Sequence, residues 1–264
     1  TIFGAEIALN HWIGGYSFQR YPFRANRKGL DMKPTSIGLN GITLLLLILC
    51  WVASAQAQIP PSENEVAKYT GLMAAAASGN AAEINALVAK GETVDIRDGY
   101  GRTPLHVATF RGHHEAMRAL AAAGVDPNAL ENDRYDIVTI AAVDNDVSTL
   151  GLALELGASA KNITSPYDGT ALIAAAHLGH AEVVRILISA GAPLDHINNL
   201  GWTALIESIV LGDGGEKHTE TLKALVDAGA DVNIADRDGQ TPLLLARSRN
   251  YEKMVVILKF ANGK

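Results

Sequence analysis

The chain has 264 residues, of which 48% are apolar and 19% are charged, an apolar content that excludes a mainly disordered chain. A balance of 22 basic against 28 acidic residues gives a net charge of −6. This charge disfavours a general nucleic-acid binder, because phosphate binding needs positive charge. The single cysteine, Cys50, excludes an intrachain disulfide framework and a multi-cysteine zinc site.

Residues 1–31 precede the first methionine, Met32, and show neither a helical nor a strand period. We interpret them as an untranslated or non-native leader, with translation starting at Met32. A genuine cytoplasmic extension is the alternative.

Residues 32–57 carry the pattern of a secretory signal peptide. A basic start is followed by an apolar run over residues 42–53 and by the small-residue pattern Ala55-Gln56-Ala57. Cleavage is expected before Gln58 or two residues earlier, which would leave a short linker over 58–63. A membrane anchor that is not cleaved is the alternative, although a spanning helix needs roughly 20 apolar residues. Because basic residues precede the run, both interpretations place the rest of the chain outside the cytoplasm, periplasmic, secreted or anchored.

The remainder of the chain repeats itself with a period near 33 residues. One marker has steps of 33, 33, 34, 33 and 38 residues, and a glycine marker shows the same drift. The first marker is Thr70, Thr103, Asp136, Thr170, Thr203 and Thr241, and the second is Gly91, Gly124, Gly157, Gly191 and Gly229. Because two independent markers agree, we divide residues 64–264 into six repeats. Their approximate bounds are 64–97, 98–130, 131–164, 165–197, 198–235 and 236–264.

Each repeat has the pattern of two short helices. The threonine or aspartate marker is a good cap for the first helix, because its side-chain oxygen can accept from free backbone N–H groups. Apolar residues then recur at helical spacing, as in Leu105, Ala108 and Leu120. The glycine marker is expected to end the second helix with a positive φ. A single helix pair cannot bury its apolar side alone, so the repeats must stack.

Three phrases resemble the ankyrin repeat: Thr103-Pro104-Leu105-His106, Gly112-His113-x-Glu115 and Gly229-Ala230-Asp231-Val232-Asn233. The resemblance covers about residues 64–263. It implies an all-α ankyrin-repeat solenoid that acts as a protein–protein interaction module. From the whole sequence we expect no catalytic residue, cofactor or metal, a protein partner of unknown identity, no nucleic acid, and a monomer. The membrane would be reached only through an uncleaved signal anchor.

In that family, partners dock on the concave face made by the turn tips and the first helices. Carried onto this sequence, the expected contacts are Tyr100, Arg102, Asp133, Tyr135, Tyr167 and Trp202 at the tips, and Phe110, Arg111, His177 and Leu211 on the helices. The four aromatic tips are expected to form an exposed row, because extended exposed apolar patches usually mark interaction sites.

The fifth repeat contains five extra residues within 211–218, a segment with three glycines. We expect the insertion to lengthen the turn between the two helices. Asp213 and His218 are then candidate contacts in a binding loop. A tolerated surface insertion is the alternative, because insertions in repeat proteins map to loops.

Other chemical interpretations are weaker. Asp144 to Glu155 has some of the oxygen spacing of a calcium loop, but Thr149 stands where that loop needs glycine. His177 and His180 lie three apart without a third metal ligand nearby, and common catalytic motifs are missing. The competing function is an accessory or protective factor for a periplasmic enzyme, for instance in oxidative defence. An enzymatic or metal-binding role of the chain's own is less favoured.

The third repeat matches the pattern least. Ala153 stands where the neighbouring repeats have leucine. A smaller packing residue is expected to cost about 1–3 kcal/mol of local stability, which makes this repeat a candidate point of flexing.

Overall fold

Helices come in pairs throughout residues 58–264, which are the residues that the computed structural model describes. The expected leader and signal peptide over 1–57 lie outside them. A short helix, α3 (Glu63–Val66), precedes the first pair. The pairs are α4 (Gly71–Ala77) with α5 (Ala81–Ala89), α6 (Pro104–Phe110) with α7 (His114–Ala122), α8 (Ile137–Val143) with α9 (Val147–Glu155), α10 (Ala171–His177) with α11 (Ala181–Ser189), α12 (Ala204–Val210) with α13 (Glu216–Asp227), and α14 (Pro242–Ser248) with α15 (Glu252–Phe260).

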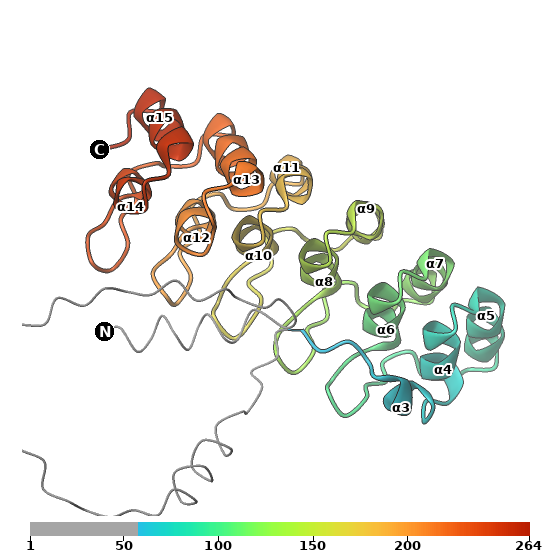
Figure 1. The fold of residues 1–264 in the computed structure, drawn as a ribbon. Helices are drawn as coiled ribbons and strands as arrows, with labels where there is room; N and C mark the ends of the chain where they lie inside the picture. Colours follow the sequence, from blue (N-terminus) through green and yellow to red (C-terminus); the bar gives the residue numbers. More distant parts are fainter. Residues whose placement is uncertain (1–57) are drawn as a thin grey trace, which may run out of the picture. The chain divides into compact units, whose positions relative to one another are not determined.

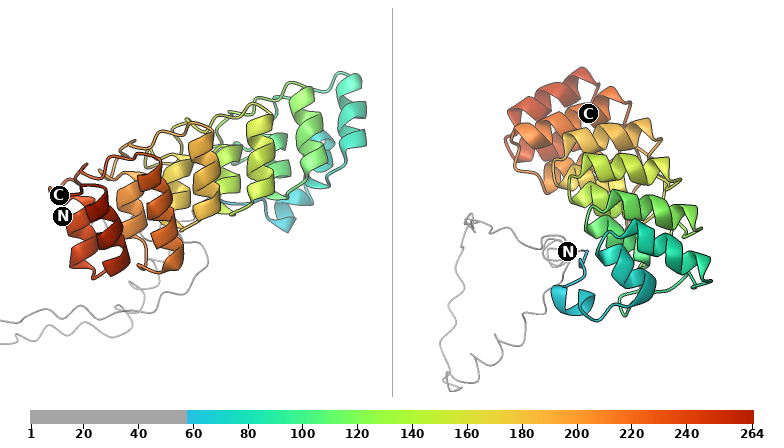
Figure 2. Two further views of the ribbon diagram at one scale, coloured as in Figure 1. Left: turned by 90° about the horizontal axis from the view of Figure 1, so that it is seen from above. Right: turned by 90° about the vertical axis from the view of Figure 1, so that its right-hand side faces the viewer.

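The pairs stack into two rows. Figure 1 shows the first helices, α4 to α14, as an inner row and the second helices, α5 to α15, as an outer row. Figure 2 shows the same rows from two further sides. The long turns between repeats project from the inner row and form the tips. The expected all-α solenoid is confirmed. In the described part of the chain, the only pairing of β type is an isolated bridge between Thr164 and Gly169.

The predicted caps form in five of the six repeats. The side chains of Thr103, Asp136, Thr170, Thr203 and Thr241 each accept from a backbone N–H in the first turn of the helix that follows. The expectation is wrong for Thr70, whose side chain makes no cap bond within the described residues. In this repeat the Glu92 carboxylate caps the helix instead, because it accepts from the backbone N–H of Leu72 at 3.0 Å.

The glycine marker also behaves as expected. Gly124 has a φ of +90° and directly follows the C-cap of α7. This left-handed conformation lets the next backbone N–H, that of Val125, reach back to the carbonyl of Leu120 at 3.1 Å. The chain therefore leaves each second helix in a fixed direction towards the next tip.

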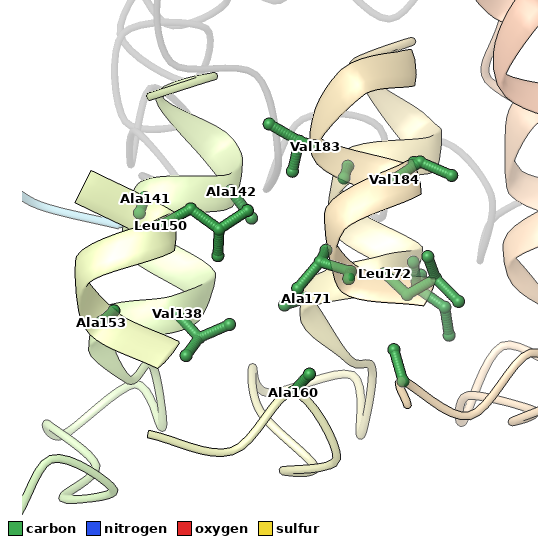
Figure 3. Packing of buried hydrophobic residues seen from close by; sticks show 14 of the residues in the cluster. Val138, Ala141, Ala142, Leu150, Ala153, Ala160, Ala171, Leu172, Val183 and Val184 are labelled. Carbon is green, nitrogen blue, oxygen red and sulfur yellow. The ribbon is translucent and has the colours of Figure 1, made fainter. Parts of the chain in front are cut away.

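The core runs between the two rows. Leu105, Ala108 and Leu120 are completely buried, as their spacing predicted. Ala153 of α9 is completely buried too and belongs to the same core cluster as Val138 and Ala141 of α8, part of which Figure 3 shows. Contacts between neighbouring second helices are sparsest around α9. The third repeat is thus held mainly through its first helix.

The insertion in the fifth repeat does not simply lengthen a turn. Helix α13 has 12 residues, whereas the second helices of the other repeats have 9. Most of the extra chain therefore adds nearly one turn to the start of α13. None of the helices within residues 58–264 has the length and hydropathy that a membrane span requires.

Candidate functional site: the inner face

Each tip is a five-residue turn closed by its first side chain. In the second repeat, Asp98 Oδ1 accepts from the backbone N–H groups of Tyr100 at 2.9 Å and Arg102 at 3.0 Å. Asn198 in the fifth repeat and Asp236 in the sixth repeat do the same. This side-chain closure fixes the direction of every residue in the tip.

Neighbouring tips are joined by backbone hydrogen bonds. Asn132 N–H donates to the carbonyl of Tyr100 at 3.0 Å, and Asn199 N–H donates to the carbonyl of Tyr167 at 2.9 Å. Ser165 N–H donates to Arg134 in the same way, at 3.0 Å. The tips of the second to the fifth repeats therefore form a continuous edge beside the inner helices.

The four aromatic tip residues do not form one exposed row. Tyr100 and Tyr167 occupy the third tip position, whereas Tyr135 and Trp202 occupy the fifth. Tyr100 is 42% exposed and Tyr135 only 3%. Tyr167 and Trp202 are half-buried, and Trp202 packs against the core. The expectation of exposure is wrong for Tyr135, because the fifth position turns towards the first helix.

Arg102 also occupies a fifth position and is buried, at 1% exposure, so its guanidinium is not an open contact. It lies 2.7 Å from Asp98 Oδ2 and 2.6 Å from Glu65 Oε1. The Tyr69 hydroxyl donates to the same Asp98 oxygen at 2.6 Å. Burial opposes ionisation of Asp98, but hydrogen bonds from Tyr69 and Arg102 outweigh it and lower the pKa of Asp98. The Tyr100 ring covers the guanidinium, with its centroid 4.6 Å away.

The ends of the inner helices offer partly open side chains. Phe110 and Leu211 are half-buried, as is Asp133 at the third position of its tip. Arg111 is also partly open, and it pairs with Glu63 of α3 at 3.1 Å. These residues remain candidates for contact with a partner.

His177 does not lie on the surface as expected. It is 6% exposed at the end of α10, and its Nδ1 lies 3.4 Å from Glu207 Oε2 of α12. Glu207 also accepts from Asn198 Nδ2 at 2.9 Å. The charged and polar groups of this cluster are directed at one another across the joint between the fourth and fifth repeats, so His177 supports that joint.

The insertion is built into the stack. Asp213 Oδ1 accepts from Gly215 N–H at 2.8 Å and lies 3.0 Å from His218 Nδ1. His218 Nε2 donates to the carbonyl of His177 at 2.9 Å, and the Tyr251 hydroxyl donates to the carbonyl of Gly212 at 2.9 Å. The segment therefore links the fourth, fifth and sixth repeats. Asp213 is exposed, whereas most of the His218 side chain is covered.

Three further histidines, His106, His113 and His180, make contacts within and between repeats. His113 and His180 are directed at the carbonyls of Ala77 and Ala142 in the preceding repeats, at 3.1 and 3.0 Å. His106 lies 3.2 Å from the carbonyl of Tyr135, and burial lowers its pKa to about 4. These contacts confirm hydrogen bonding within and between repeats as the role of the three histidines.

Within residues 58–264, no three His, Cys, Asp or Glu side chains gather as metal ligands would. In the third repeat, Asp146 caps α9 and Glu155 pairs with Arg118 at 2.9 Å, so oxygens that the calcium interpretation would use have partners in the protein. Thr149 Oγ1 donates to Asp146 Oδ2 at 2.6 Å. The oxygens of this segment therefore satisfy the helix and its neighbour.

Sequence reasoning missed the arm, which we define as residues 60–68. It contains α3, and its Glu63 and Glu65 contact Arg111 and Arg102. The pairs are 48 and 37 residues apart, so the repeat period gave no hint of them. A usable local signal was the phrase Ser62-x-x-Glu65, which forms a capping box at the start of α3.

Comparisons with known proteins agree with this architecture. The model for ankyrin repeats in three copies matches residues 39–131 and 138–236, and that for many copies matches 215–258. The ankyrin repeat protein YahD of Escherichia coli K12 is 29% identical over 185 residues, which cover 70% of this chain and 92% of YahD. Several longer curated relatives are matched over less than a fifth of their own length.

Solved structures show the same likeness. An ankyrin repeat domain from Acinetobacter baumannii AYE is 41% identical, with a TM-score of 0.69, over 73% of this chain and 98% of that domain. The ankyrin repeat domain of Bcl-3, a member of the IkappaB family, is 25% identical, with a TM-score of 0.66, over 75% and 88% of the two chains. The chain belongs to the ankyrin repeat family, whose repeats are protein-interaction modules.

Proposed function

We propose that this chain is a non-catalytic protein-binding module that holds a partner protein on its inner face. The observation that carries the proposal is the set of aromatic side chains left partly open there: Tyr100, Phe110, Tyr167 and Trp202. Aromatic residues dominate the binding energy of many interfaces. The tips that present Tyr100, Tyr167 and Trp202 are closed by side-chain hydrogen bonds, so binding would cost little entropy in ordering these tips.

We further propose that the module acts outside the cytoplasm. The support is the signal-peptide pattern of residues 32–57. Sequencing the N-terminus of the protein from an extracytoplasmic fraction should give Gln58 or Gln56. A mature protein that still carries residues 1–31 would contradict both the start site and the cleavage.

Affinity capture tests the binding function. The bait is the exported chain, compared with the double variant Tyr100→Ala/Tyr167→Ala. The control is Phe260→Ala, because Phe260 is 87% exposed on the outer row. We expect the double variant to lose about 1–3 kcal/mol of binding energy per residue and the control to lose none. Equal capture by all three baits, or turnover of a substrate by the purified chain, would contradict the proposal.

A further inference from the structure

We propose that the inner face of the first two repeats is a binding site for an acidic peptide segment of a protein, and that the arm occupies this site as an internal ligand. The inference rests on the proposed function, because it assigns a kind of partner to one part of the inner face. It also gives the arm a role: the arm competes with the partner.

The contacts place the arm along the inner side of α6. Glu63 reaches Arg111 just after the end of α6, and Glu65 reaches Arg102 just before its start. Helices α4, α7 and α8 contact α6 on its other sides. Figure 1 accordingly shows α3 on the inner side of the first helices, opposite the outer row. This is the position expected for a partner in the family.

The two guanidinium groups of the site favour a negatively charged ligand. The arm supplies two carboxylates, spaced two residues apart, to two guanidinium groups. Arg102 is also held by Asp98, which does not belong to the arm, at 2.7 Å. Beside these pairs, Val66 packs against the edge of the core. The site therefore fits a segment with two acidic residues followed closely by an apolar one.

Few buried side chains hold the arm, which lets it exchange. Helix α3 has only 4 residues and no fully buried side chain, and Pro61 is the buried residue of the arm. A helix this short is marginal without tertiary contacts. The pair between Glu63 and Arg111 is largely exposed and contributes little to stability. The arm nevertheless resists weak competitors, because a tethered segment acts at an effective concentration in the millimolar range.

The test measures binding of a fluorescent peptide with the sequence of residues 60–69. The three proteins are the full chain, its double variant Glu63→Lys/Glu65→Lys, and a control variant Glu115→Lys/Glu220→Lys. The control makes the same charge change on exposed positions of the outer helices α7 and α13. All three should melt within a few degrees of one another.

We expect the arm variant to bind the peptide at least about tenfold more tightly than the full chain and the control, because the internal competitor is gone. A peptide with glutamine in place of both glutamates should not bind. Adding Arg111→Gln to the arm variant removes one of the two guanidinium groups without offering the substituted arm a carboxylate, so the peptide should bind about threefold more weakly. Equal affinity for all three proteins, or binding of the glutamine peptide, would overturn the inference.

If the lysine variant fails to fold, the same comparison is made with Glu63→Gln/Glu65→Gln, which keeps the shape of the side chains. Capture of a partner separates the two proposals. A chain that captures its partner through the tips but never binds the acidic peptide refutes the internal ligand and leaves the proposed function standing. A chain that binds the peptide but captures no protein refutes the proposed function as stated.

Discussion

The third and fifth repeats both depart from the repeat pattern, but in opposite ways. The third keeps the normal length and loses the histidine at the start of its second helix, where Asp146 caps α9 instead. The fifth gains five residues, and its His218 still reaches the carbonyl of His177 in the fourth repeat. A repeat of ordinary length can therefore pack more weakly against its neighbours, and an insertion can strengthen the packing between repeats.

The contacts around the two repeats show the difference. The outer helix of the third repeat is joined to that of the second by two side-chain pairs, His114 with Thr149 at 2.8 Å and Arg118 with Glu155 at 2.9 Å. The outer helix of the fifth repeat packs closely against both of its neighbours. We therefore expect amide hydrogen exchange to be fastest, among the inner repeats, in α9.

The largest effect is expected from Glu207→Leu at the joint between the fourth and fifth repeats. The substitution leaves His177 and Asn198 without the carboxylate that they contact, and the loss should be about 3 kcal/mol in the free energy of unfolding. Urea unfolding measures it. The matched control is Glu220→Leu, an exposed position of α13 with an expected change near zero. Equal stability of the two variants would mean that the buried cluster does not hold the joint.

Gly214→Ala should come next, with a loss of about 2 kcal/mol. Gly214 has a φ of +71°, and an added Cβ would lie 2.3 Å from the ring of Tyr251. Thermal unfolding measures the loss, with Gly239→Ala as the control, because Gly239 has a similar φ of +73° but no atom near the added Cβ. A loss no greater than that of the control would show that the insertion is not packed against the sixth repeat.

A gain is expected in the third repeat. Ala153→Leu restores the residue found at the same position in the other repeats, and filling the space should add about 1 kcal/mol. Those leucines are Leu87, Leu120, Leu187, Leu225 and Leu258. The expected sign is opposite to that of Gly214→Ala. A loss of stability would mean that the third repeat is already fully packed and that overpacking decides the outcome.

The smallest effect is a pH dependence of the arm. Burial opposes ionisation of Glu65, but hydrogen bonds from Ser62 and Arg102 outweigh it, so its pKa lies below the ordinary 4.5. The pKa of Asp98 likewise lies below 3.8. Carboxylates with lowered pKa values stabilise the folded state above these ordinary values, and the stabilisation is lost as the pH falls through the lowered ones.

Hydrogen exchange of residues 60–69 should therefore be constant from pH 7 to 5, after correction for intrinsic rates, and should rise below about pH 4. The cap of the third repeat should respond with the opposite sign, because burial raises the pKa of Asp136. Loosening of the arm between pH 7 and 5 would point to a different contact.

Much of the fold could be predicted from the sequence, because each local pattern occurs in several repeats and can be checked from one repeat to the next. Five caps, the glycine ends of the second helices and the buried leucines all follow from spacing. The burial of the tip side chains was harder to predict. Tyr135 and Trp202 lie one residue before their caps, whereas Tyr100 and Tyr167 lie three before, and this difference decides which ring points inward. The number of residues between each aromatic residue and its cap would have predicted this difference.

The arm and the buried pair between His177 and Glu207 could not be predicted. Both depend on side chains from different repeats that meet only after stacking, and a repeat pattern does not encode such pairs. The cap of α4 departs from the pattern for another reason: Glu92 reaches the backbone N–H of Leu72 within the same repeat, 20 residues away, whereas the other repeats use the marker residue itself.

The central claim, that the inner face binds a protein, is tested most directly by site-specific photo-crosslinking in the exported chain. A photoreactive phenylalanine analogue replaces Tyr100, Tyr167 or, as the control on the outer row, Phe260. We expect a crosslinked partner of the same mass from Tyr100 and Tyr167 and none from Phe260. Crosslinks from Phe260 alone would place the partner on the outer helices and contradict the claim.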